Sequence, residues 1–380
     1  MDRVRTDWKQ VTLIWVIGLL AAAQFGKVSL AFDLVRETFA RPDPQLAFLV
    51  SGVGLVGIGF GAVAGMVAAR FAPRRVLLVA LVAGGALSVI QAAIPGFWAL
   101  IGLRVIEGLA HLAIVVACPV LMASAAASRD RPIAMALWAS FFGVSFALTA
   151  QIIPLFDSLR AVFLAHGVAL WVCLPFAWLW ITKTEVQQRP WHGLIATHLA
   201  IYSDAARVAP ALAFFWHTLV FVALLTFLPE QLTGPLSQPI IAGVLPLAAL
   251  VGTFGAGWLA RYAPPLRLCV ISFVSSIVLF GLLLPLSGLP QIGVAMVLMV
   301  SLGMVPGAAF AAIPALNPDA GDQAEANGAM AQLGNVGTAS GTPIFALALG
   351  AAGLAGLAAV TIAFCLLGIV AVLWVARRVR

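Results

Sequence analysis

Residues 61–75 read GAVAGMVAARFAPRR, and the core of this stretch occurs twice in the chain. Ala-Arg-Phe-Ala-Pro at 69–73 returns as Ala-Arg-Tyr-Ala-Pro at 260–264, 191 positions later, and Gly61 falls on Gly252 at the same shift. Each copy ends one long apolar segment and precedes another, which predicts a short basic turn between two hydrophobic helices. A period of almost half the chain is too long for a solenoid of small units and indicates a duplicated bundle of membrane helices.

The composition places the chain in a lipid bilayer. Hydrophobic residues make up 63% of the 380 residues and charged residues only 9%, whereas soluble domains carry about 25% charged residues. The net charge of +7 does not indicate nucleic-acid binding, because the basic residues sit singly at the ends of apolar segments. The four cysteines lie in apolar runs without a C-x-x-C pair, so we expect buried thiols and no disulfide, metal or cofactor.

Twelve apolar segments are long enough to cross a membrane, for which a helix needs about 20 residues. They cover residues 11–35, 45–69, 74–95, 97–123, 132–154, 161–182, 209–232, 239–260, 266–287, 289–313, 327–349 and 352–376. The polar stretch 183–208 divides them into six and six. We therefore expect a bundle at 1–182, a cytoplasmic linker at 183–208 and a bundle at 209–380. Trp191 and Tyr202 in the linker indicate that part of it lies along the membrane surface.

The repeated turn resembles the G-x-x-x-D-R-x-G-R-R signature of the major facilitator superfamily, found there between the second and third spans. Gly65 and Arg70 match, while Ala69 replaces the family's aspartate and Ala72 its second glycine. Together with the duplication and the span count, the resemblance covers the whole chain. It implies an all-α membrane protein with the superfamily fold, in which twelve transmembrane helices form two pseudo-symmetric six-helix bundles.

The distribution of Lys and Arg predicts the orientation. With the N-terminus in the cytoplasm, 16 of the 21 basic residues fall in inner connections and three in outer ones. Cytoplasmic connections carry the excess of positive charge in membrane proteins. We therefore expect a multi-pass protein of the cytoplasmic (inner) membrane with both termini on the cytoplasmic side.

One inner connection is acidic instead of basic. Asp319, Asp322 and Glu325 lie between the tenth and eleventh spans with no basic residue among them. They form either a solvated acidic loop or a cytoplasmic gate, in which they meet the arginines of the inner turns in one transport state. The arginines predicted for that gate are Arg70, Arg74, Arg75 and Arg261.

Ionisable residues inside the spans are costly and usually mark function. The first half carries Lys27 and Asp33 in its first span and Arg104, Glu107 and His111 in its fourth. The last three are spaced by three and four residues and share one helical face. Lys27 and Glu107 lie at nearly equal depth, and Asp33 and Arg104 lie nearer the outer surface. We expect two buried ion pairs, Lys27–Glu107 and Asp33–Arg104.

Arg104 to Gly108 resembles the R-x-x-x-G motif in the fourth span of superfamily drug and sugar exporters. In several of these the arginine and an acid of the first span form a proton switch, which implies roles for Arg104 and Asp33 here. A carboxylate that loses its cation is buried unpaired and should bind a proton. Our hypothesis makes Glu107 the principal proton carrier and Asp33 the second. Alternatively, these charges only neutralise one another and fix helix packing.

The second half lacks this set of charges. Arg104 maps to Ala295 and Glu107 to Leu298 in the second copy. In the superfamily the first, fourth, seventh and tenth spans line the cavity, so His217 is either a substrate contact or a packing histidine. The residues predicted to contact substrate are Lys27, Gln24, His111, His217, Gln332 and Asn335.

These patterns favour a secondary transporter that moves a small organic solute by alternating access, resembling the proton-coupled exporters of the superfamily. The alternative is proton-coupled uptake of an organic anion, attracted by the basic residues of the spans. A membrane-embedded enzyme or a non-transporting sensor is the third class. The chain has no H-E-x-x-H, G-x-S-x-G or G-x-x-x-x-G-K motif for zinc, acyl or nucleotide chemistry. Its expected partners are substrate, protons and lipid, as a monomer.

Overall fold

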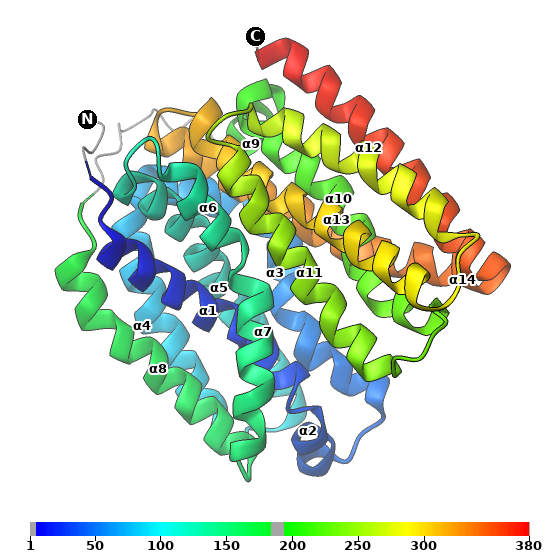
Figure 1. Ribbon diagram of the computed structural model, residues 1–380. Coiled ribbons are helices and arrows are strands. Elements are labelled where there is room, and N and C mark those ends of the chain that lie inside the picture. The colour runs from blue at the N-terminus through cyan, green and yellow to red at the C-terminus, as the bar shows by residue number, and fades with distance from the viewer. Residues whose placement is uncertain (1–4, 184–193, 380) are drawn as a thin grey trace. The chain divides into compact units, whose positions relative to one another are not determined.

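The computed structural model describes residues 5–183 and 194–379, and these form helices joined by short connections (Figure 1). The first helices are α1 (Trp8–Ser29), α2 (Phe32–Phe39), α3 (Asp43–Phe71), α4 (Pro73–Gln91), α5 (Phe97–Ala125), α6 (Arg131–Ala139), α7 (Phe141–Ile152), the 3-10 turn η1 (Ile153–Leu155) and α8 (Leu159–Trp180). They are followed by α9 (Leu194–Ser203), α10 (Ala205–Gln231), α11 (Gln238–Leu259), α12 (Pro265–Leu283), α13 (Gly288–Leu316) and α14 (Ala320–Val379). No strand occurs in the described ranges.

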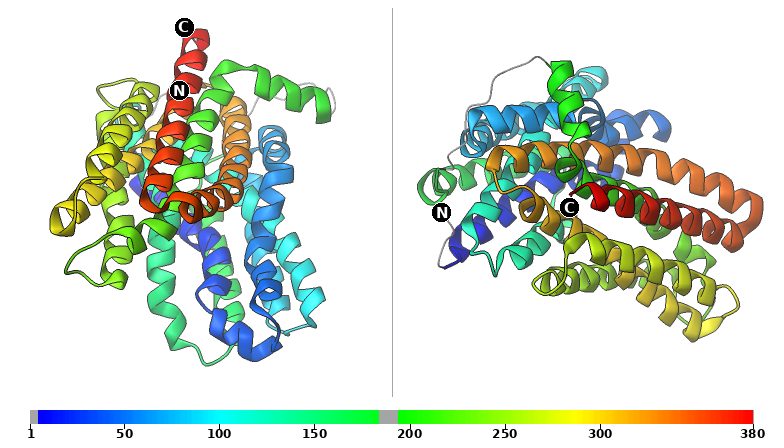
Figure 2. Two further views of the ribbon diagram at one scale, coloured as in Figure 1. Left: turned by 90° about the vertical axis from the view of Figure 1, so that its right-hand side faces the viewer. Right: turned by 90° about the horizontal axis from the view of Figure 1, so that it is seen from above.

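Ten of these helices are long and apolar enough to cross a membrane, and α6 with α7 and η1 forms a further crossing bent by 43°. Helix α14 has 60 residues but leaves helical geometry at Ala352 and Gly353. A straight helix of that length would measure about 90 Å, three times the roughly 30 Å hydrocarbon core. Both views in Figure 2 show α14 as two limbs that run back along each other. The all-α membrane fold is confirmed, and the helices are consistent with twelve crossings.

The helix boundaries follow from local chemistry. Asp7 accepts a hydrogen bond from the backbone N–H of Gln10 at 3.1 Å and caps α1. Proline occupies the first position of α4 and of α12, where its missing N–H costs nothing. Ala72, between α3 and α4, has a φ of +66°, a conformation that glycine adopts far more readily than alanine. The superfamily signature has its second glycine at this position.

The described residues divide into two compact units. The first contains residues 5–128, 141–183, 194–198 and 319–332, and the second contains 129–140, 199–318 and 333–379. Each unit thus includes a short segment from the other half of the sequence: α6 joins the second unit, and the start of α14 joins the first.

The predicted linker is only partly described, because residues 184–193, with Trp191, lie outside the described ranges. Helix α9 follows them and exposes Ile195 and Leu199 while burying Ile201. Burial raises the pKa of the Tyr202 hydroxyl to about 12, which keeps it neutral. Exposed apolar side chains on a short helix are typical of a helix that lies along a membrane surface.

In the first unit, α5 packs between α3 and α4, and α1 lies against α5, α7 and α8. Gly108 allows the close approach of α3 and α5, because a Cβ at this position would lie 2.6 Å from the carbonyl oxygen of Val53. Small residues have the same role at many membrane helix contacts. An apolar core around Leu49, Leu100 and Phe163 closes one end of this unit.

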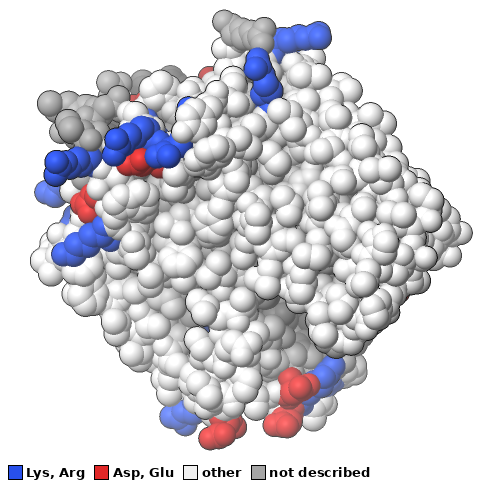
Figure 3. Space-filling model, in the orientation of Figure 1, with Lys and Arg blue, Asp and Glu red and all other residues white. Residues whose placement is uncertain are grey.

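The second unit is built around α13, which packs against α11, α12 and α10. Its core contains Leu224, Leu245, Phe280 and Leu298, and the spans described for it bury no Lys, Arg or Glu. On the face drawn in Figure 3 the charged side chains lie near the upper and lower margins, and the surface between them is uncharged. Such surfaces face lipid without an electrostatic cost.

Candidate functional site

The first unit contains a cluster of charged and polar side chains contributed by four helices. We define the buried charge cluster as Lys27 from α1, Ser88 and Gln91 from α4, Arg104 and Glu107 from α5, and His166 from α8. The side chains of Arg104 and Glu107 are fully buried and that of Lys27 is 2% exposed. Charged groups this deep require partners for almost every donor and acceptor.

Glu107 is the centre of the cluster. Its Oε1 accepts from Lys27 Nζ at 2.6 Å, and its Oε2 accepts from Arg104 Nη1 at 2.5 Å and from Gln91 Nε2 at 2.9 Å. Arg104 and Glu107 are three residues apart on α5, so they form a pair within one helix. The expected Lys27–Glu107 ion pair is present, and the carboxylate is held by two cations and one amide.

The ammonium group of Lys27 uses all three of its N–H donors. Besides Glu107, it contacts Ser88 Oγ at 2.8 Å and His166 Nδ1 at 3.3 Å. It also lies 5.0 Å from the centre of the Phe163 ring. Lys27 therefore connects α1 to α4, α5 and α8 through one charged group.

The contacts of His166 define its protonation. Its Nε2 lies 2.9 Å from the carbonyl oxygen of Leu20, which can only accept, so Nε2 carries the hydrogen. Ser88 donates its hydroxyl hydrogen to the carbonyl oxygen of Phe163 at 2.9 Å. His166 Nδ1 lies 3.1 Å from Ser88 Oγ and 3.3 Å from Lys27 Nζ, and a hydrogen on Nδ1 would face the Lys27 ammonium. Nδ1 is therefore assigned as an acceptor for Lys27, which makes the imidazole neutral.

Arg104 ties α5 to two other helices through backbone carbonyls. Its Nε donates to Leu49 O on α3 at 2.8 Å, and its Nη2 donates to Gln24 O on α1 at 2.7 Å. The side-chain amide of Gln24 is buried, and neither its oxygen nor its nitrogen has a hydrogen-bond partner. Buried polar atoms without partners are rare and mark positions where water or a ligand can bind.

The charges of the cluster do not cancel. Lys27 and Arg104 are cationic and Glu107 is anionic, and with a neutral His166 the cluster carries one excess positive charge. His111, one turn along α5, donates from Nδ1 to the carbonyl oxygen of Ala21 at 2.9 Å and meets the Phe25 ring edge to face. An excess charge in a lipid-embedded bundle is costly, so the cluster favours either an anion nearby or the loss of a proton.

The expected pair between Asp33 and Arg104 is wrong. Helix α1 ends at Ser29, and Asp33 lies in α2, where its side chain is 88% exposed and pairs with Arg36 at 2.7 Å. The break between the two helices moves Asp33 out of the first span. Arg104 takes the carboxylate on its own helix instead.

Sequence reasoning missed three members of the cluster. His166 lies inside the sixth apolar segment, where burying a polar ring in lipid costs free energy. That cost was a signal by which His166 could have been identified as a functional residue. Ser88 and Gln91 lie three residues apart on one face of α4. Small polar residues occur in many spans, so their pattern alone does not predict this role.

The remaining predicted substrate contacts lie elsewhere in the units. His217, in the second unit, is 2% exposed and stacks on Phe214 and Phe221, and its Nδ1 has no hydrogen-bond partner. Asn335 is a half-buried residue of the same unit. Gln332 belongs to the first unit, where it donates to Ile58 O at 2.8 Å, away from the charge cluster.

Two of the predicted gate arginines have partners other than the acids at 319–325. Arg261 donates through Nη2 to Asp130 Oδ1 at 2.8 Å and through Nε to the carbonyl oxygen of Arg129 at 2.9 Å. Arg74 donates to carbonyl groups at the end of α8 and satisfies acceptors that the helix itself leaves open. The two arginines therefore bind other parts of the chain.

The acids of that connection are not a solvated loop. Helix α14 begins at Ala320, and Glu325 is 5% exposed, packed where Gly65 of α3 leaves room. Asp319 and Asp322 are half-buried. The helix start turns these residues inward, which the polar character of the stretch did not show. Their part in a gate, with Arg70 and Arg75, stays a proposal.

Comparison with known proteins identifies the class of this fold, which is that of a family of membrane transporters. Residues 14–342 match the family model of the Major Facilitator Superfamily, and the chain belongs to that family. The resemblance seen in the repeated turn is thereby confirmed.

Three solved structures share the fold over nearly the whole chain. The human organic anion transporter MFSD10 (TETRAN) is 17% identical, with a TM-score of 0.76 over 96% of this chain and 99% of that one. The E. coli fucose:proton symporter FucP is 12% identical, with a TM-score of 0.74 over 97% of this chain and 98% of that one. The proton:xylose symporter XylE is 13% identical, with a TM-score of 0.73 over 98% of this chain and 96% of that one. At these identities the likeness shows the fold alone.

One curated relative is a drug-resistance protein by name. The lincomycin resistance protein of Streptomyces lincolnensis is 31% identical over 106 residues. The aligned part covers 28% of this chain and 22% of that protein, so the chain matches about a fifth of its relative's length.

Proposed function

We propose that this protein is a secondary transporter that exports a small organic solute, unchanged, in exchange for protons. Family membership supports transport, and the partial match to the lincomycin resistance protein supports export. The observation that carries proton coupling is the buried Lys27–Glu107–Arg104 group. We also propose that the protein lies in the cytoplasmic membrane with both termini on the cytoplasmic side, and that it acts as a monomer.

The coupling step follows from which helices carry the charges. Arg104 and Glu107 belong to α5 and move together, whereas Lys27 belongs to α1. If α1 withdraws from α5, the Arg104–Glu107 pair remains neutral and Lys27 is left as an unpaired buried cation. Releasing one proton removes that charge, and rebinding the proton restores the ion pair when α1 returns. Since the protonation of the two groups is coupled, the Lys27–Glu107 pair acts as the proton carrier, in place of Glu107 alone.

The unpartnered polar atoms support a solute path through each unit. The Gln24 amide lies beside the charge cluster in the first unit, and His217 presents an unpartnered Nδ1 among aromatic rings in the second. Aromatic faces with a few polar atoms suit a solute that is partly apolar.

A flux assay tests this proposal. Purified protein is reconstituted in liposomes, an inward or outward pH gradient is imposed, and labelled lincomycin, fluorescein and xylose are followed as a drug, an organic anion and a sugar. We expect gradient-driven movement of a solute to disappear in Glu107→Gln and Lys27→Met. Asp33→Asn is the matched control, because it removes a carboxylate from an exposed pair. Gradient-driven flux that survives in Glu107→Gln and Lys27→Met would exclude the coupling role.

A second candidate function is proton-coupled uptake of an organic anion. The excess positive charge of the buried cluster is the observation that favours it. The same liposomes distinguish the two, because uptake moves fluorescein with the protons and export moves the solute against them.

A further inference from the structure

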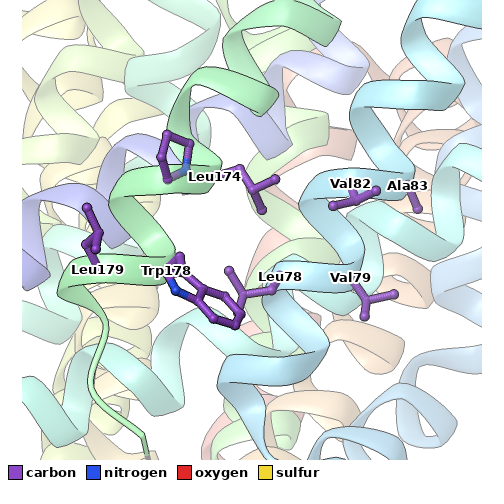
Figure 4. A pocket seen from close by; sticks show the side chains of 8 residues that line it. Leu78, Val79, Val82, Ala83, Leu174, Trp178 and Leu179 are labelled. Carbon is purple, nitrogen blue, oxygen red and sulfur yellow. The ribbon is translucent and has the colours of Figure 1, made fainter.

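An open apolar groove runs between α4 and α8 on the exposed flank of the first unit (Figure 4). Its volume is about 750 Å³, within the range of small-molecule sites. The walls include Leu78, Val79 and Val82 from α4 and Leu174, Trp178 and Leu179 from α8. Figure 4 shows Trp178 and Leu174 reaching across the space toward α4. The lining is almost entirely hydrocarbon, so the groove fits an alkyl chain and not a polar solute.

Cationic side chains lie at one end of this groove. Arg74 and Arg75 precede Leu78 and Val79 by four residues each on α4, which places each arginine about 6 Å farther along the same helical face. At the end of α8, the ammonium of Lys9 lies 3.7 Å over the Trp180 ring. The groove therefore has an apolar body and a positively charged end.

These cations are available to an anion. Arg74 uses Nε and Nη2 to bind the carbonyl oxygens of Ile181 and Trp178, at 2.8 and 2.6 Å, and its other N–H groups have no such contact. Arg75 and Lys9 are exposed. Within residues 5–183 and 194–379, none of the three forms an ion pair with an acid.

We propose that this groove binds one anionic phospholipid, with an acyl chain along α4 and α8 and its phosphate at Arg74, Arg75 and Lys9. Trp178 marks the headgroup level, because tryptophan concentrates at membrane interfaces and Arg74 lies 5.0 Å over its ring. Basic pockets between spans on the cytoplasmic side commonly hold anionic headgroups. A zwitterionic lipid carries its own cation beside the phosphate, so the site discriminates by charge.

The first test removes the exposed charges. Full-length protein in detergent is titrated with phosphatidylglycerol or phosphatidylethanolamine, and native mass spectrometry counts the lipid retained. We expect one phosphatidylglycerol to bind at lower concentration than phosphatidylethanolamine. Each basic residue near a membrane surface changes anionic-lipid binding about fivefold, so Lys9→Gln with Arg75→Gln should weaken it about thirtyfold. Arg377→Gln with Arg378→Gln removes two exposed cations from the end of α14 and should change little.

The second test fills the groove. Val82→Trp places a ring in the space between α4 and α8 and should reduce binding of both lipids, while Val278→Trp, at an exposed position of α12, should not. Equal binding of the two lipids, or unchanged binding in Val82→Trp, would overturn the proposal. Inorganic phosphate that binds as tightly as phosphatidylglycerol would also overturn it, because the acyl chain would then contribute nothing. Unchanged melting temperatures show that each variant is folded.

Discussion

Glu107→Gln replaces the one anion of the buried cluster with a neutral amide of nearly the same shape. In the native protein the Glu107 carboxylate pairs with both Lys27 and Arg104, and the cluster carries one net positive charge. The substitution therefore raises this net charge to two. Removing one partner of a buried ion pair typically costs about 3–5 kcal/mol. We expect Glu107→Gln to lower the free energy of unfolding by about this amount.

The geometry also predicts an asymmetry between the two partners. Lys27→Met leaves Arg104 and Glu107 as a neutral pair on α5, so it should cost less than Glu107→Gln. The double variant Lys27→Met/Glu107→Gln should be more stable than Glu107→Gln alone, because it lacks one of the two cations that Glu107→Gln leaves uncompensated. A double-mutant cycle on the unfolding free energies therefore yields a favourable coupling between these two side chains.

The assay is reversible denaturant unfolding of the purified protein in detergent, followed by tryptophan fluorescence, with the melting temperature as a second measure. Asp33→Asn is the control for loss of a carboxylate, and we expect a change within about 0.5 kcal/mol because its pair is exposed. The reasoning is refuted if Lys27→Met destabilises the protein more than Glu107→Gln, or if the double variant shows additive losses.

Three further outcomes follow from the described contacts. Ala72→Gly should raise the unfolding free energy by about 1 kcal/mol, since relief of backbone strain exceeds the entropy cost of glycine, and a lower melting temperature would contradict this. Asp130→Ala should cost about 1.5–3 kcal/mol through loss of the bond to Arg261, and exchanging the two charges should restore stability; independent, additive losses would show that the two side chains do not stabilise each other. Gly108→Ala should cost about 1–3 kcal/mol in the same unfolding assay, because its Cβ meets Val53 O; a neutral result would mean that α3 and α5 separate freely.

The sequence alone determined the membrane class, the duplicated helical architecture and one ion pair. These are local properties: a helix in lipid must satisfy its own backbone groups and present an apolar surface, so each span is recorded in its own residues. The Lys27–Glu107 pair could also be predicted, because a buried charge needs an opposite charge at equal depth, and few charges were available.

Only the tertiary structure decided the partners of Arg104 and Asp33. Where the first span ends depends on the break before Phe32, and this break moves Asp33 to the surface and leaves Arg104 with Glu107. Likewise, His166 joins the cluster because α8 packs against α1 and α4. Hydropathy records which residues are in lipid but not which helices are neighbours, and the partner of each buried polar atom depends on that packing.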